Sequence, residues 1–259
     1  MGLLIDRREL LAQSRARNLP LPMIEKDYVL GWALFGLSQA SNLVFKGGTA
    51  LAKVHFPQTW RLSEDLDLVT VSGSLEGVGE AVEKSLGLAA AASGLELAVV
   101  SVHANPGYVQ IKVRYTGPLG RNWLKVDVSP ESPIAAVQAR PLSQVYSDYP
   151  PFRVPTESLE EIMAEKLRAL VERKKVRDYY DVWRMSQLDL DRAAARDLFQ
   201  KKLMVKGLAG AGVETIFPRD LEATLADYWE RELGRLLYPV PDLQQVLTEL
   251  RQGLRWFER

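Results

Sequence analysis

The sequence contains no cysteine, which excludes disulfides, thiolate metal sites and a cysteine nucleophile. It also lacks an uninterrupted apolar run long enough to span a bilayer. Its first twenty residues alternate leucine with charged side chains and contain no apolar signal-peptide core. Internal repeats and low-complexity tracts are absent as well. These absences predict a soluble, cytoplasmic protein that does not associate with a membrane.

Neither sign of charge predominates, because 33 lysines and arginines balance 33 aspartates and glutamates. Nonspecific binding of nucleic acid by bulk charge is therefore not expected, and any contact with RNA requires a local basic patch. The chain of 259 residues is long enough for one large domain or two modest ones.

The most informative stretch, residues 43–70, has the pattern of strand, turn, helix and strand. Asp65 and Asp67 are expected to share one face of the second strand, where their carboxylates repel each other unless a divalent cation such as Mg²⁺ binds them. The turn at Gly47-Gly48-Thr49 opens a helix and offers backbone N–H groups that suit a phosphate. Either motif alone is commonly a polar strand edge or a simple turn, but their order and closeness favour nucleotide chemistry.

These motifs resemble a known signature. Residues 46–51 (KGGTAL) and Arg61-x-Ser63-x-Asp65-Leu66-Asp67 are similar to the nucleotidyltransferase signature of the AbiEii/AbiGii abortive-infection toxin family, which belongs to the DNA polymerase β-like superfamily. The family's later motif, Glu-x-x-x-x-Lys-x-x-Ala/Arg followed by Arg-Asp-x-x-Asp, matches Glu161, Lys166, Arg168, Ala169, Arg177, Asp178 and Asp181. The resemblance covers about residues 40–185.

The resemblance implies an α/β (α+β) fold of the polymerase β type, with a small mixed sheet and a helical C-terminal domain. Residues 129–155, rich in proline and polar side chains, are expected to form a surface connection between a nucleotidyltransferase domain (1–150) and a helical domain (151–259) that contributes Lys166. Helices are expected over 3–17, 23–38 and 75–92, and three more over 191–205, 218–237 and 241–257. The arginines of the first helix form a solvated face or, alternatively, touch an RNA backbone.

Three strand-like runs follow the central stretch, at 95–103, 108–115 and 123–128. In the third run Leu124, Val126 and Val128 fall on one face and Asp127 on the other. Enzymes of the polymerase β type place a third carboxylate on a strand beside the Asp-x-Asp pair, and Asp127 has the required order and parity. The alternative is that Asp127 is an ordinary surface residue.

The second informative stretch begins with the capping-box pattern Ser158-x-x-Glu161, which predicts the start of a helix. Lys166 falls inside the apolar stripe of this helix, where it either extends its amine to solvent or meets an anion such as a triphosphate. Asp178 and Asp181, three residues apart, share a helix face. They form a salt-bridge clasp with a neighbouring arginine or contact substrate.

Together these features predict metal-assisted nucleotidyl transfer. Asp65, Asp67 and Asp127 would hold two Mg²⁺ (or Mn²⁺) ions that orient a nucleoside triphosphate and activate an acceptor hydroxyl. Binding of the nucleotide is assigned to Lys46, Gly47, Gly48, Thr49, Arg61, Ser63 and Lys166. Among these, Lys166 would neutralise phosphate charge, and Arg61 or Ser63 would brace the loop. Asp178 and Asp181 would orient Lys166 or contact substrate.

The resemblance implies an acceptor and a partner that the residues themselves do not identify. These are the 3′ end of tRNA, whose modification stops translation, and a cognate antitoxin with a winged-helix DNA-binding domain. The basic segment 173–177 could supply a phosphate-binding patch. Two other hypotheses remain open, a noncatalytic nucleotide-binding module and a nucleotidyltransferase with a small-molecule or protein acceptor.

Overall fold

The structure is a computed structural model that describes residues 5–57 and 59–257. The chain divides into two compact units, Met1–Glu157 and Ser158–Arg259, each described separately below. This division falls a few residues after the boundary expected at 150/151, because the last strand of the sheet still belongs to the first unit.

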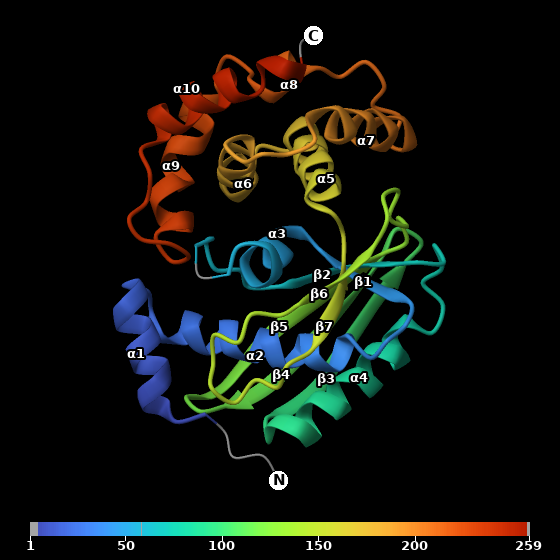
Figure 1. The fold of residues 1–259 in the computed structure, drawn as a ribbon, viewed down its shortest axis with the longest axis vertical. Coiled ribbons are helices and arrows are strands. Elements are labelled where there is room, and N and C mark those ends of the chain that lie inside the picture. The colour runs from blue at the N-terminus through green and yellow to red at the C-terminus, as the bar shows by residue number, and fades with distance from the viewer. Residues whose placement is uncertain (1–4, 58, 258–259) are drawn as a thin grey trace. The chain divides into compact units, whose positions relative to one another are not determined.

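The first unit is built on a seven-stranded mixed sheet with the strand order β3-β4-β5-β2-β1-β7-β6 (Figure 1). The strands are β1 (Leu43–Lys46), β2 (Leu66–Thr70), β3 (Glu96–Asn105), β4 (Tyr108–Gly117), β5 (Gly120–Ser129), β6 (Gln138–Pro141) and β7 (Arg153–Thr156). The β2–β5 and β1–β7 pairs are parallel, and the other neighbours pair antiparallel. The predicted α/β fold with a mixed sheet is confirmed.

The helices of this unit are α1 (Arg7–Arg17), α2 (Leu21–Leu37), α3 (Gly47–Ala50), its π-helical continuation Leu51–His55, and α4 (Val78–Ser93). The first helix was expected from residue 3, but it begins at Arg7 because the Asp6 carboxylate caps it by accepting the Arg8 N–H at 2.9 Å; residues 3 and 4 lie outside the described residues. α2 and α4 pack together at Gly36, where an added Cβ would lie 2.0 Å from the Ser85 carbonyl oxygen.

Buried apolar and exposed side chains alternate along β4 and β5, and this alternation shows which face of the sheet is buried. Val109, Ile111 and Val113 of β4 are buried, and so are Leu124, Val126 and Val128 of β5, which the sequence placed on one face. Val102 of β3, the register partner of Ile111, lies beside α4. The side chains that alternate with these residues, including Asp127, therefore lie on the face directed away from α4.

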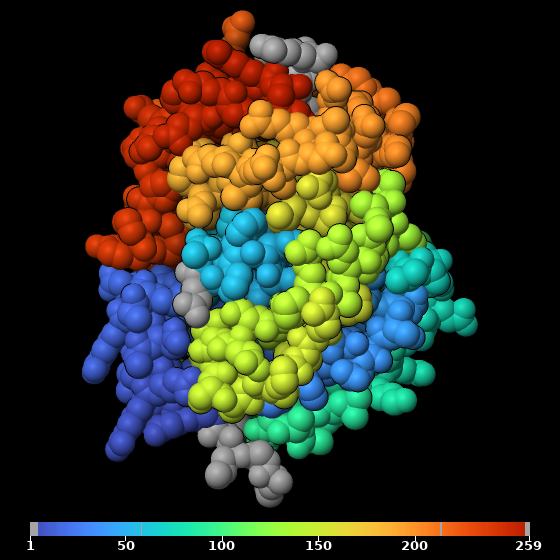
Figure 2. Space-filling model, in the orientation of Figure 1, coloured from blue at the N-terminus to red at the C-terminus, as the bar shows by residue number. Residues whose placement is uncertain are grey.

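Two strands occupy the segment expected to be a surface connection. β7 joins the sheet parallel to β1, with Phe45 opposite Thr156, and β6 pairs with β7 at its edge. Prolines at positions 141 and 155 argued against strands in the sequence. Pro141 ends the edge strand β6, where a missing N–H is tolerated, whereas Pro155 lies in β7, between β1 and β6. This segment passes beside the helical turn after β1, where the Ser143 N–H donates to the Lys53 carbonyl at 3.3 Å (Figure 2).

The second unit is helical, as predicted. Its elements are α5 (Leu159–Glu172), α6 (Val176–Ser186), α7 (Arg192–Val205), α8 (Val213–Ile216), α9 (Leu221–Leu233), α10 (Leu243–Gly253) and a 3-10 turn (Arg255–Phe257). The Ser158 hydroxyl accepts the Glu161 N–H at 3.2 Å, which confirms the predicted start of α5. Across the described ranges of both units, no helix is long and apolar enough to cross a membrane.

Candidate active site

The glycine motif and the Asp-x-Asp motif touch each other at the end of β1. Gly47 follows the last residue of β1 and has a φ of 74°, in the left-handed region that favours glycine. A Cβ added at Gly47 would lie 2.6 Å from Oδ2 of Asp67. Glycine is therefore required here for two reasons, the backbone conformation and the close approach of the carboxylate.

Three buried polar residues hold the segment that leads into the acidic motif. The Thr49 side chain donates its hydroxyl proton to the carbonyl of Asp65. Arg61 donates from Nη1 to the Leu62 carbonyl at 3.0 Å, and Ser63 is buried beside it in sequence. Since the Thr49 hydroxyl is engaged with the backbone, this turn presents backbone groups to a phosphate rather than that hydroxyl.

The sheet brings the acidic residues together. Asp67 lies on β2, opposite Lys46 of β1 on one side and opposite Asp127 of β5 on the other. Register partners on adjacent strands share a sheet face, so the two carboxylates lie on the same face. Asp65 lies in the bend immediately before β2 and not on the strand as expected. Gln110 of β4 donates from Nε2 to Oδ1 of Asp127 at 2.9 Å.

Burial and mutual repulsion make negative charge costly at this place. Burial is the main cause that raises the pKa of Asp65, and the charges of Glu64 and Asp127 add to it against the opposing effect of Lys125. Burial also raises the pKa of Asp127; the Gln110 hydrogen bond opposes this effect and the Asp67 charge reinforces it. A bound cation would remove this cost.

The donor set fits a divalent metal by its chemistry, because three carboxylates offer the hard oxygen ligands that Mg²⁺ prefers. Within residues 5–57 and 59–257, however, no group of three or more His, Asp or Glu side chains already converges closely enough to hold a metal ion. A metal site formed by Asp65, Asp67 and Asp127 thus requires side-chain rotation when the ion binds.

The second unit contains the predicted lysine in a charged cluster. Nζ of Lys166 on α5 lies 2.8 Å from Oδ1 of Asp178 and 2.9 Å from Oδ2 of Asp181, both on α6. Nε of Arg173 lies 2.9 Å from the other oxygen of Asp178. Burial by itself would raise the pKa of Asp178, but Lys166 and Arg173 outweigh it and lower that pKa to about 2. Both aspartates thus contact Lys166 and fix the position of its amine.

Two buried lysines that pair with carboxylates were not predicted. Nζ of Lys202 on α7 lies 2.9 Å from Oε1 of Glu161 and 3.0 Å from Oε1 of Glu165. In the first unit, Nζ of Lys53 lies 2.9 Å from Oδ1 of Asp27 and donates to the Asp27 carbonyl at 2.7 Å. Neither lysine belongs to a sequence motif. The spacing of apolar residues along a helix does not show which charged side chains form ion pairs in the protein interior.

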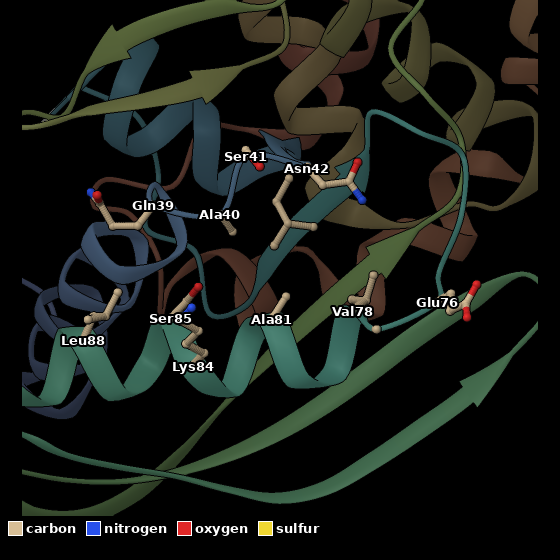
Figure 3. Close-up of a pocket in the computed structure, with 12 residues that line it drawn as sticks. Gln39, Ala40, Ser41, Asn42, Glu76, Val78, Ala81, Lys84, Ser85 and Leu88 are labelled. Atoms are coloured by element: carbon tan, nitrogen blue, oxygen red, sulfur yellow. The ribbon is translucent and has the colours of Figure 1, made fainter.

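A cavity of about 260 Å³ lies in the first unit between α4 and the segment that connects α2 to β1 (Figure 3). Asn42 and Ser41 border it from the connecting segment, and Lys84 and Ser85 border it from α4. It lies at the start of β1, whereas Gly47 follows the end of that strand. None of the predicted site residues lines it.

Comparison with known proteins identifies the family. The family model of the AbiEii nucleotidyl transferase toxins of type IV toxin–antitoxin systems matches residues 32–251. The chain belongs to this family. It is therefore a nucleotidyltransferase of the AbiEii toxin family, and its membership implies a nucleoside triphosphate substrate and a cognate antitoxin. The family predicted from the two motifs is confirmed.

Solved structures share the fold of this AbiEii family member. MenT4, a nucleotidyltransferase toxin from Mycobacterium tuberculosis H37Rv, is 22% identical with a TM-score of 0.72, and the match covers 99% of this chain and 90% of that one. JHP933 from Helicobacter pylori is 19% identical with a TM-score of 0.58, and the match covers 92% of this chain and 93% of that one. No curated protein matched the chain.

Proposed function

We propose that this nucleotidyltransferase uses a divalent metal, Mg²⁺ or Mn²⁺, to transfer nucleotides from a nucleoside triphosphate to the 3′ end of tRNA, and so blocks translation until its antitoxin intervenes. The observation that carries the proposal is the contact between Gly47 and Asp67 together with the register of Asp67 against Asp127. This arrangement places a phosphate-compatible turn beside a pair of carboxylates.

Each residue has a stated part in the proposed reaction. Asp65, Asp67 and Asp127 would hold the metal, which would supply positive charge to the oxygens around the α-phosphate. In the transfer the acceptor hydroxyl oxygen attacks the α-phosphorus, its proton is lost, and pyrophosphate leaves. The turn at Gly47 and Gly48 offers backbone N–H groups to the outer phosphates.

Other residues support this centre in the proposal. Lys46 and Lys166 supply positive charge to the triphosphate, and Asp178 and Asp181 position the Lys166 amine through the two contacts described above. Arg61 and Ser63 hold the loop that carries Asp65. These two residues act through the loop and do not contact the reacting atoms.

A transfer assay tests the acceptor. Purified protein is incubated with Mg²⁺, total tRNA and each of the four α-labelled nucleoside triphosphates in turn, beside a protein that carries Asp65→Ala and Asp67→Ala. We expect label on tRNA with the native protein alone, and chelation of the metal should abolish it. If a protein or a small molecule becomes labelled and RNA does not, the labelled molecule is the acceptor and tRNA is not. Nucleotide binding without any transfer would favour a noncatalytic module.

A further inference from the structure

The sheet face that carries the carboxylates continues outward as a row of cationic side chains. Pairing of β4 with β5 sets opposite each other Gln110 and Asp127, Lys112 and Lys125, Arg114 and Trp123, and Thr116 and Arg121. Because side chains alternate along a strand, all of these lie on the face of Asp127 and point away from α4. The row therefore begins at the acidic centre and follows two strands away from it.

This row is exposed and unusually basic for a chain without net charge. Lys112, Arg114, Arg121 and Lys125 are exposed, and Trp123 remains 38% exposed despite its size. Residues 108–125 contain these four cations and no acidic residue. Nζ of Lys112 lies 4.4 Å from the centre of the Trp123 ring, so the indole is held among the charges. We define Lys112, Arg114, Arg121, Trp123 and Lys125 as the basic face.

A basic face with an exposed aromatic ring matches the chemistry of a single RNA strand. Lysine and arginine neutralise backbone phosphates, and a flat aromatic ring stacks on a base without regard to sequence. At a rise of about 3.4 Å per residue, Lys125, Trp123 and Arg121 lie about 7, 14 and 20 Å from Asp127 along β5. The spacing suits a strand whose end reaches the carboxylates while its preceding nucleotides follow β5.

We propose that the basic face binds the acceptor RNA, with phosphates on its cations and one base stacked on Trp123, and so directs the 3′ end to Asp127. This inference rests on the proposed transfer to RNA. Lys125 links the two regions, because its charge acts on the carboxylates of both Asp65 and Asp127.

The basic segment singled out in the sequence, residues 173–177, is less suited to this task. Arg173 is paired with Asp178, and Lys174 donates to the carbonyl of Leu170 at the end of α5. These side chains are engaged in holding their own helices. The basic face instead presents its cations on a regular sheet with nearly equal spacing.

The test compares two proteins that lose equal charge. One carries Lys112→Gln, Arg114→Gln and Arg121→Gln. The matched control carries Lys84→Gln, Arg192→Gln and Lys201→Gln, three exposed cations on α4 and α7. The first variant keeps Lys125 and the carboxylates of the active site unchanged. Thermal unfolding of both proteins verifies that they remain folded.

We expect the first variant to raise the KM for tRNA at least about tenfold, with kcat and the KM for the nucleotide unchanged. The dependence of the logarithm of RNA affinity on the logarithm of salt concentration should become shallower by about 2, since three phosphate contacts are lost at about 0.7 each. The control should behave as the native protein. An unchanged KM for tRNA, or an equal loss in the control, would overturn the proposal.

Trp123 provides an independent arm. Trp123→Ala should weaken RNA binding about tenfold, in the range of a lost base–aromatic stack, and Trp123→Phe should restore most of it. Equal affinity of the alanine variant and the native protein would refute stacking. If the native protein transfers label to tRNA while the cationic variant is unimpaired, the basic face fails and the proposed function stands. If the native protein neither binds nor modifies RNA, both fail.

Discussion

Replacement of Gly47 by alanine tests the contact at the centre of the site. An alanine at a φ of 74° has a cost of about 1–2 kcal/mol for the left-handed backbone. Its Cβ would also lie 2.6 Å from Oδ2 of Asp67, closer than real Cβ atoms approach another atom, and 3.1 Å from Cβ of Asp67, which is a tight contact. The Asp67 carboxylate must therefore move by several tenths of an ångström or more.

A control separates this displacement from backbone strain. Gly77, at the start of α4, has a φ of 70° and no atom within 4 Å of an added Cβ. Gly77→Ala should therefore destabilise folding by about the same 1–2 kcal/mol without touching the site.

Urea unfolding and single-turnover transfer of labelled nucleotide are measured on both variants. Gly47→Ala should lose about 100-fold in transfer rate, the scale expected when a catalytic group is displaced by about 1 Å, while Gly77→Ala retains the native rate. If Gly47→Ala transferred nucleotide as fast as Gly77→Ala, Asp67 would not need its observed position and the reasoning would be refuted.

Three further predictions concern charged groups. The pKa of Asp178 is about 2 in the folded protein, below its ordinary value, so the stability that this carboxylate contributes is complete above about pH 4 and is lost as the pH falls toward 2. Urea unfolding of Asp178→Asn should therefore show about 2 kcal/mol less stability at neutral pH than that of the native protein. The stability of the variant should also lack this pH-dependent loss. Lys53→Met leaves the buried Asp27 carboxylate without its cation and should lower stability by about 3–5 kcal/mol, partly recovered by adding Asp27→Asn; no recovery would contradict the pairing. Gln110→Leu removes a hydrogen bond that lowers the pKa of Asp127, so the fall of the transfer rate at acidic pH should begin at a higher pH than in the native protein. An unchanged dependence of the transfer rate on pH would show that the Asp127 carboxylate takes no part in transfer.

Local sequence patterns were sufficient to predict the features that depend on the alternation of side chains along a strand or on the residue that caps a helix. The alternation around Asp127 correctly indicated which side chains of β5 are buried, and Ser158 correctly indicated the start of α5. The two motifs correctly predicted the family. The same patterns could not place Asp65, which stands one residue before β2, because the end of a strand depends on the neighbouring strand with which it pairs.

The remaining features depend on contacts between distant segments. β7 pairs with β1 across more than one hundred residues, and its proline argues against a strand when only neighbours in sequence are considered. Lys53 and Asp27 look like ordinary surface charges until folding buries them against each other. The basic face was hidden by the zero net charge, because only the register of β4 with β5 shows that its cations lie together.

The most direct test of the account is the transfer rate of single carboxylate variants. Labelled nucleotide and tRNA are incubated with Mg²⁺ and the native protein, Asp65→Asn, Asp67→Asn or Asp127→Asn, and with Glu64→Gln as a control that removes the adjacent carboxylate. The account predicts a loss of about 100-fold or more for each aspartate variant and a rate near that of the native protein for Glu64→Gln, a loss comparable to that on removing one transition-state-stabilising group. Native rates in any of the three aspartate variants would contradict the assignment of that carboxylate to the active site.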